Sequence, residues 1–397
     1  MKSLNDLQRV RVPAIVFPVA LGFVLLTGCG GGSNGGTITT TPPPPPKTTY
    51  LAVDDTQNNR VLIYDSPFST GQSASIVLGQ SSFTTATPDL SATGMYYPSA
   101  SAADSAGNLW VVDSVHSRVL EFETPFTTGM SASLAIGEPN FTTGNGGTSQ
   151  SLLGGPSAIT FDSSGNLWVP DAMNCRVLEF KPPFATGMNA DLVIGQTGFS
   201  TSICTTTSSG MGAPFALAFD SAANLWVADT WSNRILEYQP PFTTGMSASL
   251  VIGQPNFTSN ATGTTSSTFT EPTSIAFDSN GDLWAADPQN NRVLEFQKPF
   301  TTGMSASLVL GQSSFTSASH ATTKNSFALG DNAGIAFDSS GNLWITDVVN
   351  NRVLEFTPPF SNDQNASLVL GQVNFTTNTL NSPSASSLYQ PGGVSAF

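Results

Sequence analysis

The sequence predicts an all-β fold, a six-bladed β-propeller, from three features. One unit recurs at a nearly constant spacing along the 397 residues, and each copy holds four short apolar runs separated by turn residues. Hydrophobic residues make up 39% of the chain, whereas only 10% are charged. Six copies of a four-stranded unit are the composition of a propeller, and this much apolar sequence is enough for its core.

The repeat is located by its arginines, which lie 58, 58, 58, 58 and 60 residues apart. A period this regular indicates an array of equivalent structural units. The arginines in this register are Arg60, Arg118, Arg176, Arg234, Arg292 and Arg352.

One complete copy spans residues 156–199, with strands a, b, c and d expected at 157–161, 167–170, 176–180 and 191–194. Strand a carries small side chains, which suit the crowded centre of a propeller. Strand b is apolar on both faces and holds a tryptophan in five copies, which we expect in the core between blades. These positions are Ala158, Ala216, Ser274 and Gly334 in strand a, and Trp110, Trp168, Trp226, Trp284 and Trp344 in strand b.

The shared pattern is Pro-x-x-Ile-x-Phe-Asp, then Gly-Asn-Leu-Trp-Val-x-Asp-x-x-Asn-x-Arg-Val-Leu-Glu-Phe, and it resembles the NHL repeat over residues 50–397. The resemblance implies a six-bladed propeller of NHL-like blades that is used mostly for binding. These copies are longer than a typical NHL unit. The extra residues follow strand c, as Pro-Phe-x-x-Gly, and strand d, as Gly-Gln-x-x-Phe.

The ends of the repeat array predict how the ring closes. The first copy begins at Tyr50, already in strand b, and the last segment, 393–397, has the character of a lone strand a. We expect this C-terminal strand to complete blade 1, because closure removes open sheet edges. The alternative is a chain that continues into a seventh blade.

Residues 1–28 have the pattern of an export signal, in which basic residues precede an apolar run that is short for a bilayer span. The run Leu26-Thr27-Gly28-Cys29 resembles the lipobox of bacterial lipoproteins, which implies cleavage before Cys29 and its lipidation. The alternative is an ordinary signal peptide. Residues 29–49 add a Gly-, Thr- and Pro-rich linker suited to a tether. We therefore expect an exported protein, lipid-anchored to a membrane of the bacterial cell envelope.

Most charged residues of the repeat have an expected structural role, so few remain as candidates for catalysis. The net charge of −14 repels phosphate backbones, so no nucleic-acid partner is expected. Each arginine of the repeat follows an aspartate by five residues, which predicts a structural ion pair across every b–c hairpin. The aspartates are Asp55, Asp113, Asp171, Asp229, Asp287 and Asp347.

Metal chemistry is not expected either. Some NHL propellers are metal-dependent lyases, but their zinc needs several histidines and this chain has two, His116 and His320. The turn from Asp278 to Asp282 resembles a calcium loop yet lacks the further carboxylates that such a loop needs. The sequence therefore predicts no catalytic residue, no metal ligand and no cofactor. The alternative is a metal-dependent hydrolase or lyase at the channel mouth.

Function is expected where the copies differ, in the b–c and d–a loops. Trp231 is the one tryptophan outside the repeat register, and exposed aromatic residues among polar loops suit peptide or sugar binding. The alternative is that Trp231 packs beneath the adjacent long loop. We expect a monomeric binding or scaffold propeller for a protein, peptide or glycan. The candidate ligand-binding residues are Trp231, His116, Tyr96, Tyr97, Met173 and Gln289.

Two cysteines lie in loops that share one face of a propeller: Cys175 in the b–c loop of the third copy and Cys204 in the following d–a loop. An exported protein permits disulfides, so we expect a Cys175–Cys204 bond. The alternative is two free thiols.

Overall fold

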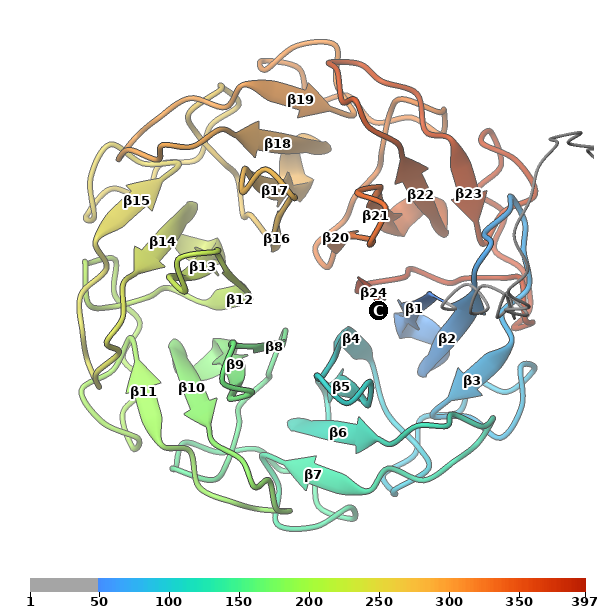
Figure 1. The fold of residues 1–397 in the computed structure, drawn as a ribbon, viewed down its shortest axis with the longest axis horizontal. Helices are drawn as coiled ribbons and strands as arrows, with labels where there is room; N and C mark the ends of the chain where they lie inside the picture. The colour runs from blue at the N-terminus through green and yellow to red at the C-terminus, as the bar shows by residue number, and fades with distance from the viewer. Residues whose placement is uncertain (1–48) are drawn as a thin grey trace, which may run out of the picture. The chain divides into compact units, whose positions relative to one another are not determined.

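The computed structural model describes residues 49–397, which form six antiparallel four-stranded sheets arranged as blades around a central axis (Figure 1). The predicted all-β, six-bladed propeller is confirmed. The predicted signal peptide, Cys29 and almost all of the linker lie outside the described residues. Within the described part of the chain, no helix has the length and apolar character needed to cross a membrane.

The strands are assigned to blades as follows. Blade 1 contains β1 Tyr50–Asp55, β2 Arg60–Asp65, β3 Ile76–Leu78 and β24 Val394–Ala396; blade 2 contains β4 Pro98–Ala103, β5 Leu109–Asp113, β6 Arg118–Phe122 and β7 Leu134–Ile136; blade 3 contains β8 Thr160–Phe161, β9 Leu167–Asp171, β10 Arg176–Phe180 and β11 Leu192–Ile194. Blade 4 contains β12 Pro214–Phe219, β13 Leu225–Asp229, β14 Arg234–Tyr238 and β15 Leu250–Ile252; blade 5 contains β16 Ser274–Phe277, β17 Leu283–Asp287, β18 Arg292–Phe296 and β19 Leu308–Leu310; blade 6 contains β20 Ile335–Phe337, β21 Leu343–Asp347, β22 Arg352–Phe356 and β23 Leu368–Leu370. Short 3-10 turns join strands b and c at η1 Thr56–Asn58, η2 Ala172–Asn174, η3 Thr230–Ser232, η4 Pro288–Asn290 and η5 Val348–Asn350.

Strand a of blade 3 is shorter than predicted. The strand β8 covers Thr160–Phe161 alone, and Pro156 pairs with Asp171 through an isolated bridge. The partner strand contains Pro170 where blades 2, 4 and 5 have Val112, Ala228 and Ala286. Because proline has no N–H to donate, the ladder is interrupted there.

The ring closes as predicted. The strand β24 pairs antiparallel with β1, with Val394 opposite Val53, and the Asp54 N–H donates to the Gly393 carbonyl at 3.0 Å. The two strands lie side by side in Figure 1, although they come from the two ends of the described chain. Blade 1 therefore has no open inner edge.

The recurring tryptophans form the core between blades. All five are fully buried. For example, the Trp168 ring of blade 3 packs edge-on against Phe219 and Phe242 of blade 4, with ring centroids 5.8 and 5.1 Å apart. The interpretation of these residues as inter-blade core is confirmed, and each contributes the large contact area typical of a buried aromatic side chain.

The predicted ion pairs are present in all six blades, with Nε–Oδ2 distances of 2.6–2.8 Å and both side chains fully buried. The rest of each guanidinium group donates to backbone carbonyls of the d–a loops. Arg118, for example, reaches the carbonyls of Phe141, Ser91 and Gly94 at 2.6, 2.9 and 3.1 Å. Each arginine therefore fixes its own hairpin and the long loops on either side of it.

The extra residues after strand c cover the outer edge of the preceding blade. In β3, the Val77 N–H donates to the Thr128 hydroxyl at 3.3 Å, and the Val77 carbonyl accepts from the Gly129 N–H at 3.1 Å. Thr70 and Gly71 make the same contacts to Val369 of β23, so the pattern continues across the closure. These bonds satisfy backbone groups that an exposed edge strand would leave open.

Candidate functional site

The b–c hairpins and the d–a loops lie at the same end of the blades, because alternate connections of a four-stranded meander share one end. At this end a pocket of about 460 Å³ opens between blades 2, 3 and 4. No charged side chain from the described part of the chain lines it. Its large lining side chains are Tyr97, Val115, Met173, Phe215 and Trp231.

The b–c hairpins present three of these side chains. Val115, Met173 and Trp231 each lie two residues after the buried aspartate of their hairpin and are 47, 76 and 63% exposed. The hairpin turns tightly, since the residue before each arginine adopts a left-handed conformation, as Asn233 does with φ 52°. The alternative in which Trp231 packs beneath its neighbouring loop does not describe this structure.

Phe215 and Val115 complete the apolar lining, and the sequence analysis selected neither. Phe215 lies in strand a of blade 4, where blades 2, 3 and 5 have Ser99, Ser157 and Thr273. It is the one large side chain at a register position reserved for small residues. That departure from the repeat was the signal that could have identified it.

Tyr97 comes from the d–a loop before blade 2. It adopts φ 64°, and its N–H donates to the Asn59 side chain at 3.0 Å. Burial raises the pKa of the Tyr97 hydroxyl, the Asp331 carboxylate adds to this rise, and a hydrogen bond with Gln57 opposes it. The hydroxyl therefore stays protonated at neutral pH and can donate a hydrogen bond to a ligand.

Three predicted site residues do not line the pocket. His116 Nδ1 lies 2.9 Å from Asp113 Oδ2, at the position where four other hairpins place an asparagine on the same carboxylate. Tyr96 packs against the His116 ring, with centroids 5.8 Å apart. Gln289 donates to Glu271 and Asp331 at 3.2 and 2.8 Å on another part of the rim. These contacts give His116 and Tyr96 structural partners within blade 2.

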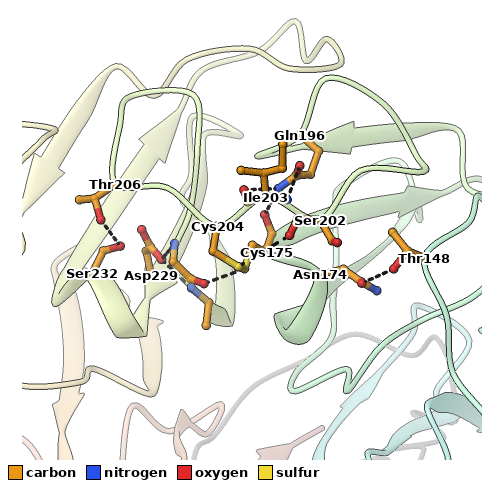
Figure 2. Close-up of a disulfide and its surroundings, with 12 residues drawn as sticks. Thr148, Asn174, Cys175, Gln196, Ser202, Ile203, Cys204, Thr206, Asp229 and Ser232 are labelled. Atoms are coloured by element: carbon orange, nitrogen blue, oxygen red, sulfur yellow. Dashed lines mark hydrogen bonds between the residues drawn. A yellow bond between two sulfur atoms is a disulfide. The ribbon is translucent and has the colours of Figure 1, made fainter.

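A disulfide joins Cys175 and Cys204, whose Cα atoms are 5.3 Å apart (Figure 2). Beside it, the Gln196 amide donates to the carbonyls of Cys175 and Ile203 at 3.1 and 2.9 Å. In other blades an asparagine in the register of Cys175 links the hairpin to the loop; Asn233, for instance, donates to the Asn260 carbonyl at 2.9 Å. The disulfide replaces this hydrogen-bonded bridge beside the pocket with a covalent one.

Residues 49–397 place no cluster of metal-ligating side chains in the central channel. Its cavity of about 120 Å³ is lined by the innermost strands, mainly by small residues such as Ser101, Ala158 and Gly334. The lining contains no histidine, cysteine or carboxylate from residues 49–397. Over that same range, the one cluster of three acidic side chains is Asp278, Asp282 and Glu295, in the a–b turn of blade 5 at the opposite end of the blade. The donors present do not fit a metal-dependent hydrolase or lyase at the channel mouth.

No protein-family model and no curated protein sequence matches the chain. Among solved structures, a protein of unknown function from Bacteroides caccae is similar at 10% identity with a TM-score of 0.52, covering 88% of this chain and 99% of that chain. A chain of a nidogen/laminin complex is similar at 13% identity with a TM-score of 0.51, covering 88% and 98%. The virginiamycin B lyase of Staphylococcus aureus has 13% identity and a TM-score of 0.38, covering 67% and 71%, which is too low to support an argument. At these identities the likeness shows the propeller fold alone.

Proposed function

We propose that this protein is a binding propeller whose pocket between blades 2, 3 and 4 takes an apolar side chain from a polypeptide partner. One observation carries the proposal: Val115, Met173 and Trp231, exposed on three consecutive hairpins, surround a single uncharged pocket. Exposed apolar groups gathered in this way are typical of interaction sites.

The chemistry of the lining favours a peptide. Methionine and valine side chains pack against hydrocarbon surface, and a methionine adapts to partners of varied shape. Ser99 and Ser114 already hydrogen-bond to each other and to the carbonyls of Ser157 and Pro156. Their oxygens and the Tyr97 hydroxyl leave only a few positions that could orient a peptide backbone. A glycan presents many hydroxyls around the C–H faces of its rings, and the lining offers few groups to pair with these hydroxyls. A peptide or protein segment is therefore the occupant that we favour.

The cellular setting of the proposal rests on the sequence. The lipobox-like run at Cys29 and the linker up to residue 49 support an exported propeller tethered to a membrane of the cell envelope. The NHL-like repeat supports a binding role, and the net charge of −14 argues against nucleic acid.

A peptide array of defined sequences tests the proposal. The purified protein is compared with Trp231→Ala and with Val349→Ala, a matched control that has the same register in blade 6, is exposed, and does not line the pocket. An anchoring tryptophan contributes about 2 kcal/mol or more, so Trp231→Ala should weaken binding roughly 30-fold. Binding to Val349→Ala should not change.

Two results would contradict the proposal. Equal loss of binding in both variants would remove the pocket as the site. Glycan-array binding that disappears in Trp231→Ala, without peptide binding to the unaltered protein, would assign the pocket to a sugar.

A further inference from the structure

The a–b turn of blade 5 differs from its counterparts at two positions: Asn280 stands where they have Ala or Ser, and the last residue of the turn is acidic. In the turns of blades 2, 3, 4 and 6 the last residue is an asparagine, whose Nδ2 donates to the first aspartate of the turn at 2.8–3.0 Å. In blade 5 this residue is Asp282. An amide donor is thereby replaced by a second carboxylate facing the first.

A third carboxylate comes from the neighbouring strand. Glu295 on β18 is paired with Trp284 on β17, and this register brings it to the turn. One oxygen each of Asp278, Asp282 and Glu295 lies within 4.8 Å of the other two. Asp282 and Glu295 are buried, each 8% exposed. Like charges at this separation, two of them buried, repel each other strongly unless a cation lies between them or one carboxyl group keeps its proton.

An orphaned tryptophan provides a second, independent observation. In blades 2, 3, 4 and 6 the indole N–H donates to the first aspartate of the turn at 3.0–3.2 Å. The Trp284 N–H occupies the same register and is fully buried, yet it has no hydrogen-bond partner among the described residues. The indole N–H at this turn therefore lacks the acceptor that its counterparts have, and Asp278 Oδ2 accepts instead from the Asn280 side chain, at a long 3.4 Å.

The protein's own cations do not fill this place. Among the ion pairs formed by residues 49–397, none links a lysine or arginine nitrogen to these three carboxylates within 4.0 Å. One cationic side chain, that of Lys298, comes close to the turn, with its Nζ beside Gly281. Its backbone N–H, and not its ammonium group, donates to Asp282 at 3.1 Å.

We propose that Asp278, Asp282 and Glu295 bind a calcium ion at the end of blade 5 that lies opposite the peptide pocket. Two oxygens bound to one calcium at 2.3–2.6 Å lie at most about 5.2 Å apart, which the observed spacing satisfies. Asp278, Asn280 and Asp282 follow the alternating spacing of a calcium loop, and Glu295 supplies from β18 the further carboxylate that the linear sequence lacks. Water completes the six to eight ligands that calcium requires.

Calorimetric titration of the full chain with CaCl₂ tests this site. We expect one ion per chain with a dissociation constant on the order of 10⁻⁴–10⁻³ M, the range of extracellular calcium modules. Asp282→Asn restores the asparagine of the other blades and is the matched variant. It should bind at least tenfold more weakly while unfolding in EDTA at the same temperature as the unaltered protein, or a higher one. Calcium should raise the unfolding temperature of the unaltered protein alone.

Several outcomes would overturn the proposal. One is the absence of any heat of binding at about 10 mM CaCl₂, which is ten times the weakest expected dissociation constant. Another is an affinity for calcium in Asp282→Asn equal to that of the unaltered protein. A third is an affinity of the unaltered protein for Mg²⁺ equal to its affinity for calcium. Binding that is observed in Lys298→Met and not in the unaltered protein would also overturn it, because the ammonium group would then be the cation that neutralises the cluster.

Discussion

Two positions in each b–c hairpin, only two residues apart, follow opposite rules. The aspartate that precedes the turn is fully buried in all six blades. In each blade it forms an ion pair with the arginine five residues later. The side chain two residues later is partly or well exposed, and it is Gln, Val, Met, Trp, Gln or Val in blades 1 to 6. Replacing the buried aspartate would leave the arginine charge desolvated and unpaired, so this position does not tolerate change. The residue two positions later contributes little to the fold. A propeller can therefore vary its binding face while keeping its framework.

Replacing the buried aspartate of a b–c hairpin should have the largest effect on stability. Asp229→Ala leaves Arg234 fully buried without its carboxylate, and we expect the free energy of unfolding to fall by about 3–5 kcal/mol. Urea unfolding followed by tryptophan fluorescence measures this. A loss below about 1 kcal/mol, within the range of exposed ion pairs, would contradict the contrast between the two positions.

Removing the Cys175–Cys204 disulfide tests how much the bond between the b–c hairpin and the d–a loop contributes to stability. Cys204→Ser opens a covalent loop with a sequence separation of 29 residues, which should lower the free energy of unfolding by about 2–4 kcal/mol. The double variant Cys175→Asn/Cys204→Ser restores the asparagine that blades 1, 4, 5 and 6 have in this register, and it should regain about 1 kcal/mol through its hydrogen bonds to the loop. Denaturation of all three proteins without reductant compares them. A double variant less stable than Cys204→Ser would show that the asparagine bridge is not recovered.

Asp54 and Asp55 extend the comparison to two adjacent acids. Asp55 has Arg60, whereas Asp54 accepts a hydrogen bond from the Ser101 hydroxyl at 3.1 Å and its Oδ1 has no partner among the described residues. Burial raises the pKa of Asp54 to about 7, although the Ser101 hydrogen bond opposes this rise. Between pH 4 and 7 the folded protein keeps a proton that the unfolded chain releases. Stability therefore falls as the pH rises, by at most about 1.4 kcal/mol per unit, and levels off above pH 7.

The variant Asp54→Asn should remove this fall. Urea unfolding at pH 5 and pH 8 measures the change for the unaltered protein, for Asp54→Asn and for Asp331→Asn, an exposed control. We expect a smaller loss of stability between the two pH values in Asp54→Asn alone. An equal loss in all three proteins would refute the assignment to Asp54.

The smallest effect is expected two residues beyond Asp229. Trp231→Ala removes an exposed side chain, so the free energy of unfolding should change by no more than about 0.5 kcal/mol. The same variant is expected to lose peptide binding. Thermal unfolding beside the peptide array separates the two roles, and a large loss of stability would make Trp231 part of the framework.

Much of the framework could be predicted from the sequence because the repeat sets it. The period of the arginines predicted six blades, the recurring tryptophans predicted the inter-blade core, and the missing first strand predicted closure by 393–397. Of the ligand-binding candidates, Tyr97, Met173 and Trp231 line one pocket. His116 was selected because it departs from the repeat, but the structure shows that its imidazole takes over the hydrogen bond of the asparagine it replaces.

The sequence by itself determined what each blade must do alone: strand order, turn chemistry, the buried Asp–Arg pair and the residues free to differ. Only the tertiary structure decided which free residues meet. Phe215 joins Trp231 and Met173 because neighbouring blades bring their rims together, and Glu295 reaches Asp278 and Asp282 through the register of two strands. Contacts of this kind depend on the distance between elements in space, and a periodic pattern specifies each element without specifying that distance.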